Sequence, residues 1–149
     1  ISADALWERG FGVVFPELEG DDAFAELGET IDLIETLAPA LVIPGHGRLF
    51  TDVPGAIAFA RKRLQSFVAD PARHTRHAAK VLLKFHLLEV QRQPLAEFVG
   101  WALATPYFGM MALSHPPGVD LRRWVEELVA ELVRAGAAAM DHEVIVNAG

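Results

Sequence analysis

Residues 41–47 read Leu-Val-Ile-Pro-Gly-His-Gly, and the predicted fold is built outward from this stretch. Its first three residues form a short apolar run, which is typical of a strand buried on both faces. The turn that follows places His46 between two glycines, where backbone can approach a ligand closely. Ligands of open α/β sheets bind beyond such strand ends. Taken alone, the turn leaves two interpretations open: a functional imidazole, or a histidine that faces solvent.

The sequence on either side of this turn predicts alternating strands and helices. Residues 12–15, Gly-Val-Val-Phe, form a β-branched and aromatic run that Pro16 closes, and we expect a strand there. Apolar residues at three- and four-residue steps predict a helix over residues 23–37, with an acidic N-cap before it and Pro39 after it. A second amphipathic helix is expected after Asp52, which is a favourable N-cap. The apolar stripe of that helix comprises Ile57, Ala60, Leu64 and either Phe67 or Val68.

A carboxylate near the start of the chain adds weight to the functional interpretation. Asp4 follows a short β-like segment, where a lone Asp is most often a helix cap. Together, however, the Asp4 segment, a strand, a helix, a second strand and the Pro-Gly-His-Gly turn resemble the C-terminal half of the metallo-β-lactamase superfamily. In that family an Asp bridges two metal ions and the His of the turn binds one of them. The resemblance covers about residues 1–69 and implies that Asp4 and His46 are metal ligands, although Ala3 stands where Gly usually precedes the Asp.

The remaining metal ligands of that family are absent from this sequence. Its His-x-His-x-Asp-His signature occurs nowhere in the chain, and neither does the further His that separates this signature from the Asp. A catalytic zinc site needs about three protein ligands and a water. We therefore expect a C-terminal fragment of a zinc-dependent hydrolase, inactive and nearly metal-free alone. In the intact protein the resemblance implies two zinc ions and a zinc-bound hydroxide that attacks an ester, thioester or amide of a small-molecule substrate.

The sequence beyond residue 69 predicts a second domain. Helices are expected over residues 74–90, 95–104 and 120–134, and a terminal β-hairpin follows them. Gly136 is placed to cap the third of these helices. The first of them has an expected core stripe of Ala78, Val81, Leu82, Phe85 and Leu88.

Three helices followed by a hairpin are the element order of a winged-helix module. The predicted fold class is therefore α/β, half of an αββα metallo-β-lactamase fold over residues 1–69, followed by a mainly helical winged-helix-like domain over residues 70–149.

Composition excludes several classes of protein. The 149 residues are 52% hydrophobic with a mean hydropathy of +0.25, which excludes disorder as the main state. The absence of cysteine excludes a disulfide scaffold and a cysteine nucleophile, and the net charge of -7 argues against a generic polyanion binder. The chain shows no signal-peptide pattern, and prolines interrupt its one long uncharged stretch, residues 98–119. We expect a cytoplasmic protein that does not enter a membrane.

The other histidines give weaker signals. His74 and His77 lie three residues apart and could chelate a metal, but beside several basic residues a solvated basic face is the preferred interpretation. His86 is expected to be partly buried in a helix, whereas His115 and His142 are expected in turns.

Two other classes of function stay open. Basic residues of the first C-terminal helix, such as Arg73 and Arg76, could make the second domain a nucleic-acid-binding module, but acidic residues on the third helix argue against it. The domain could instead be a non-catalytic protein-interaction domain. The segment around Trp101 and Phe108 could offer an apolar surface for packing on the hydrolase body, or it could be ordinary core. Self-association is expected, because the missing half would leave apolar surface open.

Overall fold

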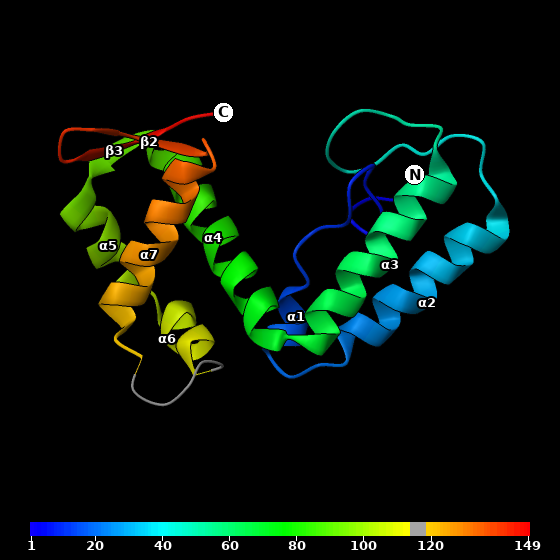
Figure 1. The fold of residues 1–149 in the computed structure, drawn as a ribbon, viewed down its shortest axis with the longest axis horizontal. Coiled ribbons are helices and arrows are strands. Elements are labelled where there is room, and N and C mark those ends of the chain that lie inside the picture. The colour runs from blue at the N-terminus through cyan, green and yellow to red at the C-terminus, as the bar shows by residue number, and fades with distance from the viewer. Residues whose placement is uncertain (114–118) are drawn as a thin grey trace. The chain divides into compact units, whose positions relative to one another are not determined.

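The protein is mixed α/β, rich in helix, with one small three-stranded sheet (Figure 1). This computed structural model describes residues 1–113 and 119–149. The chain divides into two compact units, Ile1–Arg73 and His74–Gly149, which are called the first and second unit below. The sequence placed the division after residue 69, and the structure places it a few residues later, in the first turn of the helix that begins at Pro71.

The first unit is built on two helices, α2 (Ala23–Leu37) and α3 (Val53–Ala69), which pack against each other. Both were expected from their apolar periodicity, and α2 has the predicted bounds. The Asp52 carboxylate accepts a hydrogen bond from the Gly55 amide at 3.0 Å, which confirms the predicted cap of α3. The core between the helices and the loops is formed by Leu6, Phe11, Phe24, Ile31, Val42, Phe50, Val53, Ala56, Ile57, Ala60 and Phe67.

The N terminus of α2 is capped differently from the expectation. Asp22 occupies the N-cap position, but its side chain accepts no capping hydrogen bond. The carboxylate of Glu17 does so instead, accepting from the Phe24 amide at 2.8 Å. Glu17 lies in a short helix, α1 (Phe15–Leu18), that the sequence did not predict and that begins with Pro16 in its first turn. The cap therefore comes from an element that is separate in sequence from the helix it stabilises.

The two strands predicted in the first unit are wrong. Within residues 1–73, all of which are described, backbone pairing is limited to isolated bridges: Ala3 with Pro44, Trp7 with Gly10, and Val42 with Phe50. Of the run predicted to be buried on both faces, only Val42 is buried, whereas Leu41 and Ile43 are about half exposed. A strand is stabilised by hydrogen bonds to neighbours on both sides, and the apolar sequence of one segment cannot supply those neighbours.

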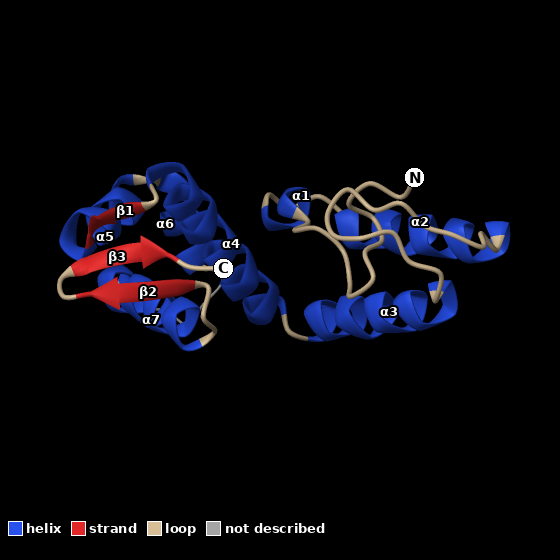
Figure 2. Cartoon of the chain, turned by 90° about the horizontal axis from the view of Figure 1, so that it is seen from above, coloured by secondary structure: helices blue, strands red, loops and turns tan. Residues whose placement is uncertain are grey.

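The second unit contains the sheet. It comprises α4 (Pro71–Val90), β1 (Arg92–Pro94), α5 (Leu95–Ala104), α6 (Pro106–Ala112), α7 (Leu121–Arg134), β2 (Ala138–Asp141) and β3 (Val144–Asn147), as Figure 2 shows. The strands are antiparallel in the order β1-β3-β2, with β3 in the centre. The predicted terminal hairpin is confirmed, and His142 lies in its turn with a φ of 55°. The strand β1 and the helix α6 were not predicted from the sequence.

The end of α7 follows the predicted pattern closely. Gly136 has a φ of 73°, a conformation that suits glycine, and its amide donates to the Val133 carbonyl at 3.0 Å. The Ala137 amide donates to the Leu132 carbonyl at 2.9 Å. These two bonds are the Schellman arrangement that satisfies the last carbonyls of a helix. The chain is thereby turned from α7 directly into β2.

The buried face of α4 is not the predicted one. The residues that the core covers include Ala79, Leu83 and Leu87, while Phe85 and Leu88 of the predicted stripe are 55% and 44% exposed. Both sets recur at helical spacing, so periodicity alone does not distinguish them. Only Ala78 of the predicted stripe is fully buried.

Lys84 of α4 forms hydrogen bonds with residues at the end of the C-terminal strand, β3. The Lys84 ammonium donates to the carbonyls of Ala137 at 2.6 Å and Ala148 at 2.7 Å, and to the Asn147 side chain at 2.5 Å. The Asn147 amide also donates to the Gln91 carbonyl at 2.8 Å. The end of α4 and the end of β3 are therefore joined by backbone and side-chain bonds.

The uncharged stretch of residues 98–119 forms two separate helices over most of its described part, α5 and α6. Within residues 1–113 and 119–149, no helix is both long and apolar enough to cross a membrane. In α6, Phe108 and Met111 are buried, which favours the core interpretation of these side chains over an exposed packing surface.

Candidate functional site

The structure brings the two predicted site residues, Asp4 and His46, into direct contact. Nδ1 of His46 lies 3.0 Å from Oδ1 of Asp4, although the two residues are 42 positions apart in sequence. The contact follows from the backbone, because Ala3 and Pro44 form a parallel bridge in which the Gly45 amide donates to the Ala3 carbonyl at 2.7 Å. Two loop segments are thus joined at the point where each carries a polar side chain.

Two glycines make room for the Asp4 side chain. A Cβ on Gly45 would lie 2.6 Å from Oδ1 of Asp4, and a Cβ on Gly12 would lie 2.9 Å from the Asp4 Cβ. Any larger residue at either position would displace the carboxylate. Ala3, which stands where the metallo-β-lactamase pattern usually has Gly, adopts a φ of 47°, in the left-handed region that glycine occupies without strain. The site thus depends on small residues in three loop positions.

A third side chain, Trp7, belongs to this cluster and was missed by the sequence analysis. Its indole Nε1 donates to Oδ1 of Asp4 at 3.3 Å. The Trp7 and His46 rings also meet edge to face, with centroids 5.2 Å apart and planes at 61°. The signal that could have revealed this contact is the three-residue spacing between Asp4 and Trp7. Such a spacing brings side chains together in a helix, but no helix was predicted for this segment.

The direction of the hydrogen bonds follows from the groups involved. An ionised carboxylate only accepts, so Nδ1 of His46 donates to Asp4, and Nε2 of the neutral imidazole carries the lone pair. The side chains remain accessible, with 71% of His46 and 59% of Asp4 exposed. Within the described part of the chain, Oδ2 of Asp4 takes no hydrogen bond.

The donor set fits part of a zinc site. A carboxylate oxygen and an imidazole nitrogen are ordinary zinc ligands, and here the two side chains are exposed and hydrogen-bonded to each other. Residues 1–113 and 119–149 contain no group of three or more His, Cys, Asp or Glu side chains that could hold a metal ion. The described residues therefore provide two ligands, fewer than the three that a catalytic zinc ion ordinarily takes from protein.

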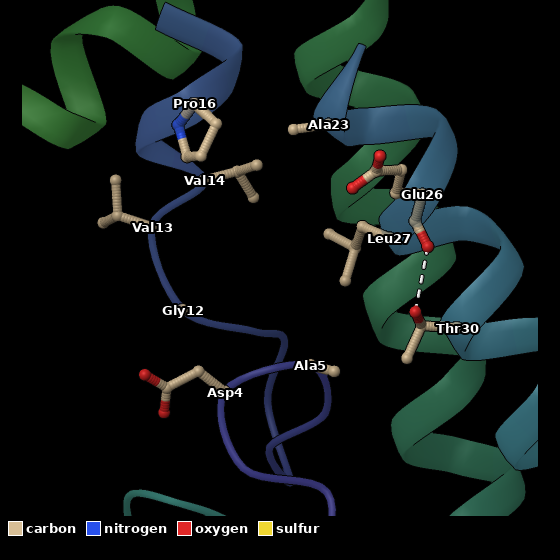
Figure 3. Close-up of a pocket in the computed structure, with 10 residues that line it drawn as sticks. All are labelled: Asp4, Ala5, Gly12, Val13, Val14, Pro16, Ala23, Glu26, Leu27 and Thr30. Atoms are coloured by element: carbon tan, nitrogen blue, oxygen red, sulfur yellow. Dashed lines mark hydrogen bonds between the residues drawn. The ribbon is translucent and has the colours of Figure 1, made fainter. Parts of the chain in front are cut away.

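An open pocket of about 310 Å³ adjoins the Asp4 segment. One wall is the backbone from Gly12 to Pro16 and the other is the first half of α2, with Leu27 and Thr30 facing the opening (Figure 3). The figure shows the Asp4 carboxylate directed away from α2, so the pocket is mainly apolar where it meets the loop.

The remaining histidines do not join this cluster. His74 is buried, which contradicts the prediction of a solvated basic face. His86 is partly buried as expected: its ring stacks on Trp101 at 3.8 Å, and its Nε2 lies 3.0 Å from the Gln93 side-chain oxygen. His115 lies outside the described residues.

Three basic side chains of α4, those of Arg76, Lys80 and Lys84, are engaged within the second unit. Arg76 and Lys80 both bind the Glu131 carboxylate of α7, at 2.6 Å and 3.0 Å. Lys84 holds the C-terminal segment. The hydrogen bond from Arg76 lowers the pKa of Glu131, and its contacts with Lys80 act in the same direction. These charges are paired with protein groups, which disfavours α4 as a surface for phosphates.

Comparison with known proteins gave no match: no family model, no curated protein and no solved structure is significantly similar to this chain.

Proposed function

We propose that the chain is the C-terminal part of a metal-dependent hydrolase of the metallo-β-lactamase superfamily, in which Asp4 and His46 are metal ligands. The observation that carries this proposal is the 3.0 Å contact between these two side chains across 42 residues of sequence. The resemblance assigned each of them from a separate motif.

In this proposal the chain supplies two ligand positions, and the others come from a polypeptide segment that carries the His-x-His-x-Asp-His signature. When bound, zinc would lower the pKa of a water molecule and polarise the carbonyl of an ester, thioester or amide. The task of Asp4 and His46 is to hold the ion at the exposed edge of the loops. Gly12 and Gly45 serve that task by leaving space for the carboxylate.

The apolar side chains that the first unit exposes are consistent with a missing half. Ile1, Ile43 and Leu49 are 100%, 49% and 63% exposed, and Ile1 and Ile43 lie in the same loops as the two proposed ligands. Exposed apolar side chains promote association when they lie together on a surface. The chain alone is therefore expected to self-associate, and a monomer in sedimentation at high concentration would count against this part of the proposal.

For the second unit we propose a winged-helix-like module. Its order of helix, strand, helices and hairpin, with the sheet order β1-β3-β2, supports this assignment. The ion pairs of Arg76 and Lys80 with Glu131 favour a role in packing or substrate access over nucleic-acid binding.

The test compares this chain with the longest natural polypeptide that contains it. Metal content and esterase and thioesterase activity would be measured for both, with Asp4→Ala and His46→Ala in each. The proposal expects about two zinc ions and activity in the long form, neither in this chain, and loss of activity in both variants. A long form that binds no metal, or variants that keep full activity, would show that these residues are not metal ligands.

A further inference from the structure

The pocket beside α2 has walls that are joined by hydrogen bonds of the first unit. Its volume of about 310 Å³ lies at the lower end of the range of small-molecule sites. One wall, the backbone from Gly12 to Pro16, leads into α1, where the Glu17 carboxylate accepts from the Phe24 amide of α2 at 2.8 Å. At the start of this wall, the Gly12 amide donates to the Asp4 carbonyl at 2.8 Å. The two walls are therefore held in place without a ligand.

The walls of the pocket are mainly apolar. In Figure 3 the Val14 side chain extends toward α2, and the Leu27 side chain extends from α2 toward the loop. Both are partly buried and pack against the core of the first unit. Pro16 and Ala23 also line the pocket. An aliphatic chain between these walls would be removed from water, which is favourable in proportion to the apolar area that it buries.

The Glu26 carboxylate extends into the opening of the pocket. Figure 3 shows this side chain reaching from α2 toward the segment that carries Val14 and Pro16. Within residues 1–113 and 119–149, its carboxylate forms neither an ion pair nor a hydrogen bond. The other carboxylate of the lining, that of Asp4, is directed away from α2 and bonded to His46. None of the 10 lining residues has a basic side chain, so the pocket favours a cationic ligand over an anionic one.

We propose that this pocket binds a small molecule that carries a primary alkylammonium group. The alkyl chain lies between Val14 and Leu27, and the ammonium group donates to the Glu26 carboxylate. An ammonium group has three N–H donors, and a hydrogen bond between two charged groups is stronger than one between neutral groups. Neither His46 nor the Asp4 carboxylate takes part, so this binding site is independent of the proposed hydrolase and of any metal ion.

Three ligands of equal chain length test the chemistry of the site. n-Hexylammonium, 1-hexanol and hexanoate would each be titrated into the ¹⁵N-labelled chain near neutral pH and followed on the backbone amide signals. We expect n-hexylammonium to shift the amides of Val14 and Leu27. It should bind about threefold more tightly than 1-hexanol and about tenfold more tightly than hexanoate, since charge pairs at exposed sites have modest energies. Hexanoate binding as tight as that of n-hexylammonium refutes the proposal, and so do shifts confined to residues outside the pocket.

Glu26→Gln tests the charge, because it keeps the size of the side chain and removes the carboxylate. We expect this substitution to weaken n-hexylammonium binding about threefold and to leave 1-hexanol binding unchanged. Glu29→Gln is the matched control, since Glu29 is also an exposed glutamate of α2 but does not line the pocket. Equal losses in the two variants would contradict the proposal, because the general negative charge of α2 would then attract the cation.

A filled pocket tests the location of the site. Ala23→Phe adds a ring to a lining position, whereas Ala25→Phe adds the same ring to an exposed position of α2 outside the lining. We expect n-hexylammonium binding to be lost in Ala23→Phe and unchanged in Ala25→Phe. Dispersed amide spectra show whether each variant is folded, and Thr30→Phe, at another lining position of α2, replaces Ala23→Phe if that variant is not. Unchanged binding in the folded filled variant overturns the proposal.

Discussion

The two units of the chain are held together in different ways. In the first, the loops that carry Asp4 and His46 are joined by isolated bridges, and the regular structure lies in the helices beside them. In the second, β3 is paired along its length with strands on both sides, and α7 contacts both α5 and β2. The comparison shows that the polar cluster is on the less regular unit. The geometry of this cluster depends on a few close backbone contacts between loops, whereas the second unit has a continuous ladder of strand hydrogen bonds.

The largest expected effect comes from the core of the second unit. Phe98 is fully buried in α5, and its ring contacts those of His86 and Trp101. Phe98→Ala should lower the free energy of unfolding of this unit by about 3–5 kcal/mol, because it removes apolar contacts and leaves a cavity. The loss of unfolding free energy can be measured in urea by amide hydrogen exchange, which reports on each unit separately.

Phe85→Ala is the matched control, since Phe85 lies on α4 but is 55% exposed. We expect it to lower stability by well under half as much as Phe98→Ala. Equal losses in the two variants would mean that the exposed face of α4 is covered in solution. If amide protons of residues 1–73 also lose their protection from exchange in Phe98→Ala, the two units unfold together.

Gly45 and Gly136 are required for different physical reasons, one in each unit. Gly45 is needed for space, because a Cβ there would lie 2.6 Å from Oδ1 of Asp4. Gly136 is needed for its φ of 73°, and a Cβ there would meet nothing within 4 Å. Gly45→Ala should disrupt the Asp4–His46 contact, whereas Gly136→Ala should lower the stability of the second unit by about 1–2 kcal/mol and leave that contact intact.

Both effects can be read from one set of spectra. The His46 ring signals report the Asp4 contact, and thermal unfolding reports the stability of each variant. A Gly45→Ala chain with unchanged His46 signals would mean that the loops can move apart without loss of the contact, which the close approach of Gly45 to Asp4 does not allow.

The smallest effect concerns the ion pairs between α4 and α7. Hydrogen bonding from Arg76 lowers the pKa of Glu131 below its ordinary value of 4.5. The stabilisation is therefore complete above the ordinary value and is lost as the pH falls through the lowered folded-state pKa. Because Glu131 is partly exposed, we expect Glu131→Gln to remove less than about 1 kcal/mol of this pH-dependent stability.

Urea unfolding midpoints measured from neutral pH down to pH values below 4.5 would test this. Glu126→Gln is the control, since among residues 1–113 and 119–149 the ion pair of Glu126 is with Arg122, at 3.9 Å on the surface. If Glu126→Gln flattens the acid limb of the stability profile as much as Glu131→Gln does, the pairing across the two helices is not its cause.

Local signals in the sequence were sufficient for most helices. The bounds of α2 and α5 match their predicted ranges, and the Schellman end of α7 follows from Gly136. These features depend on residues that are close in sequence, so periodicity and capping describe them. The shorter elements α1, β1 and α6 carry too few residues to show a period.

Features that depend on distant partners were not predictable in the same way. Two sets of apolar residues on α4 have helical spacing, and only packing against the rest of the unit selects Leu83 and Leu87 over Phe85 and Leu88. The predicted strands of the first unit failed for the same reason, since pairing needs a neighbour. The family resemblance assigned Asp4 and His46 as metal ligands without predicting the hydrogen bond between them, and Trp7 was missed because its contact arises from a turn.

The lysine that fastens β3 to α4 also has a consequence for the order of folding. Lys84 contacts residues 137 and 148, so its hydrogen bonds close nearly the whole length of the second unit. Closing so long a segment is entropically costly and slows folding relative to a bundle of local contacts. During synthesis, α4 therefore leaves the ribosomal exit tunnel well before residues 137 and 148, whose carbonyls accept hydrogen bonds from Lys84. The second unit can complete its sheet only after its last strand has been synthesised.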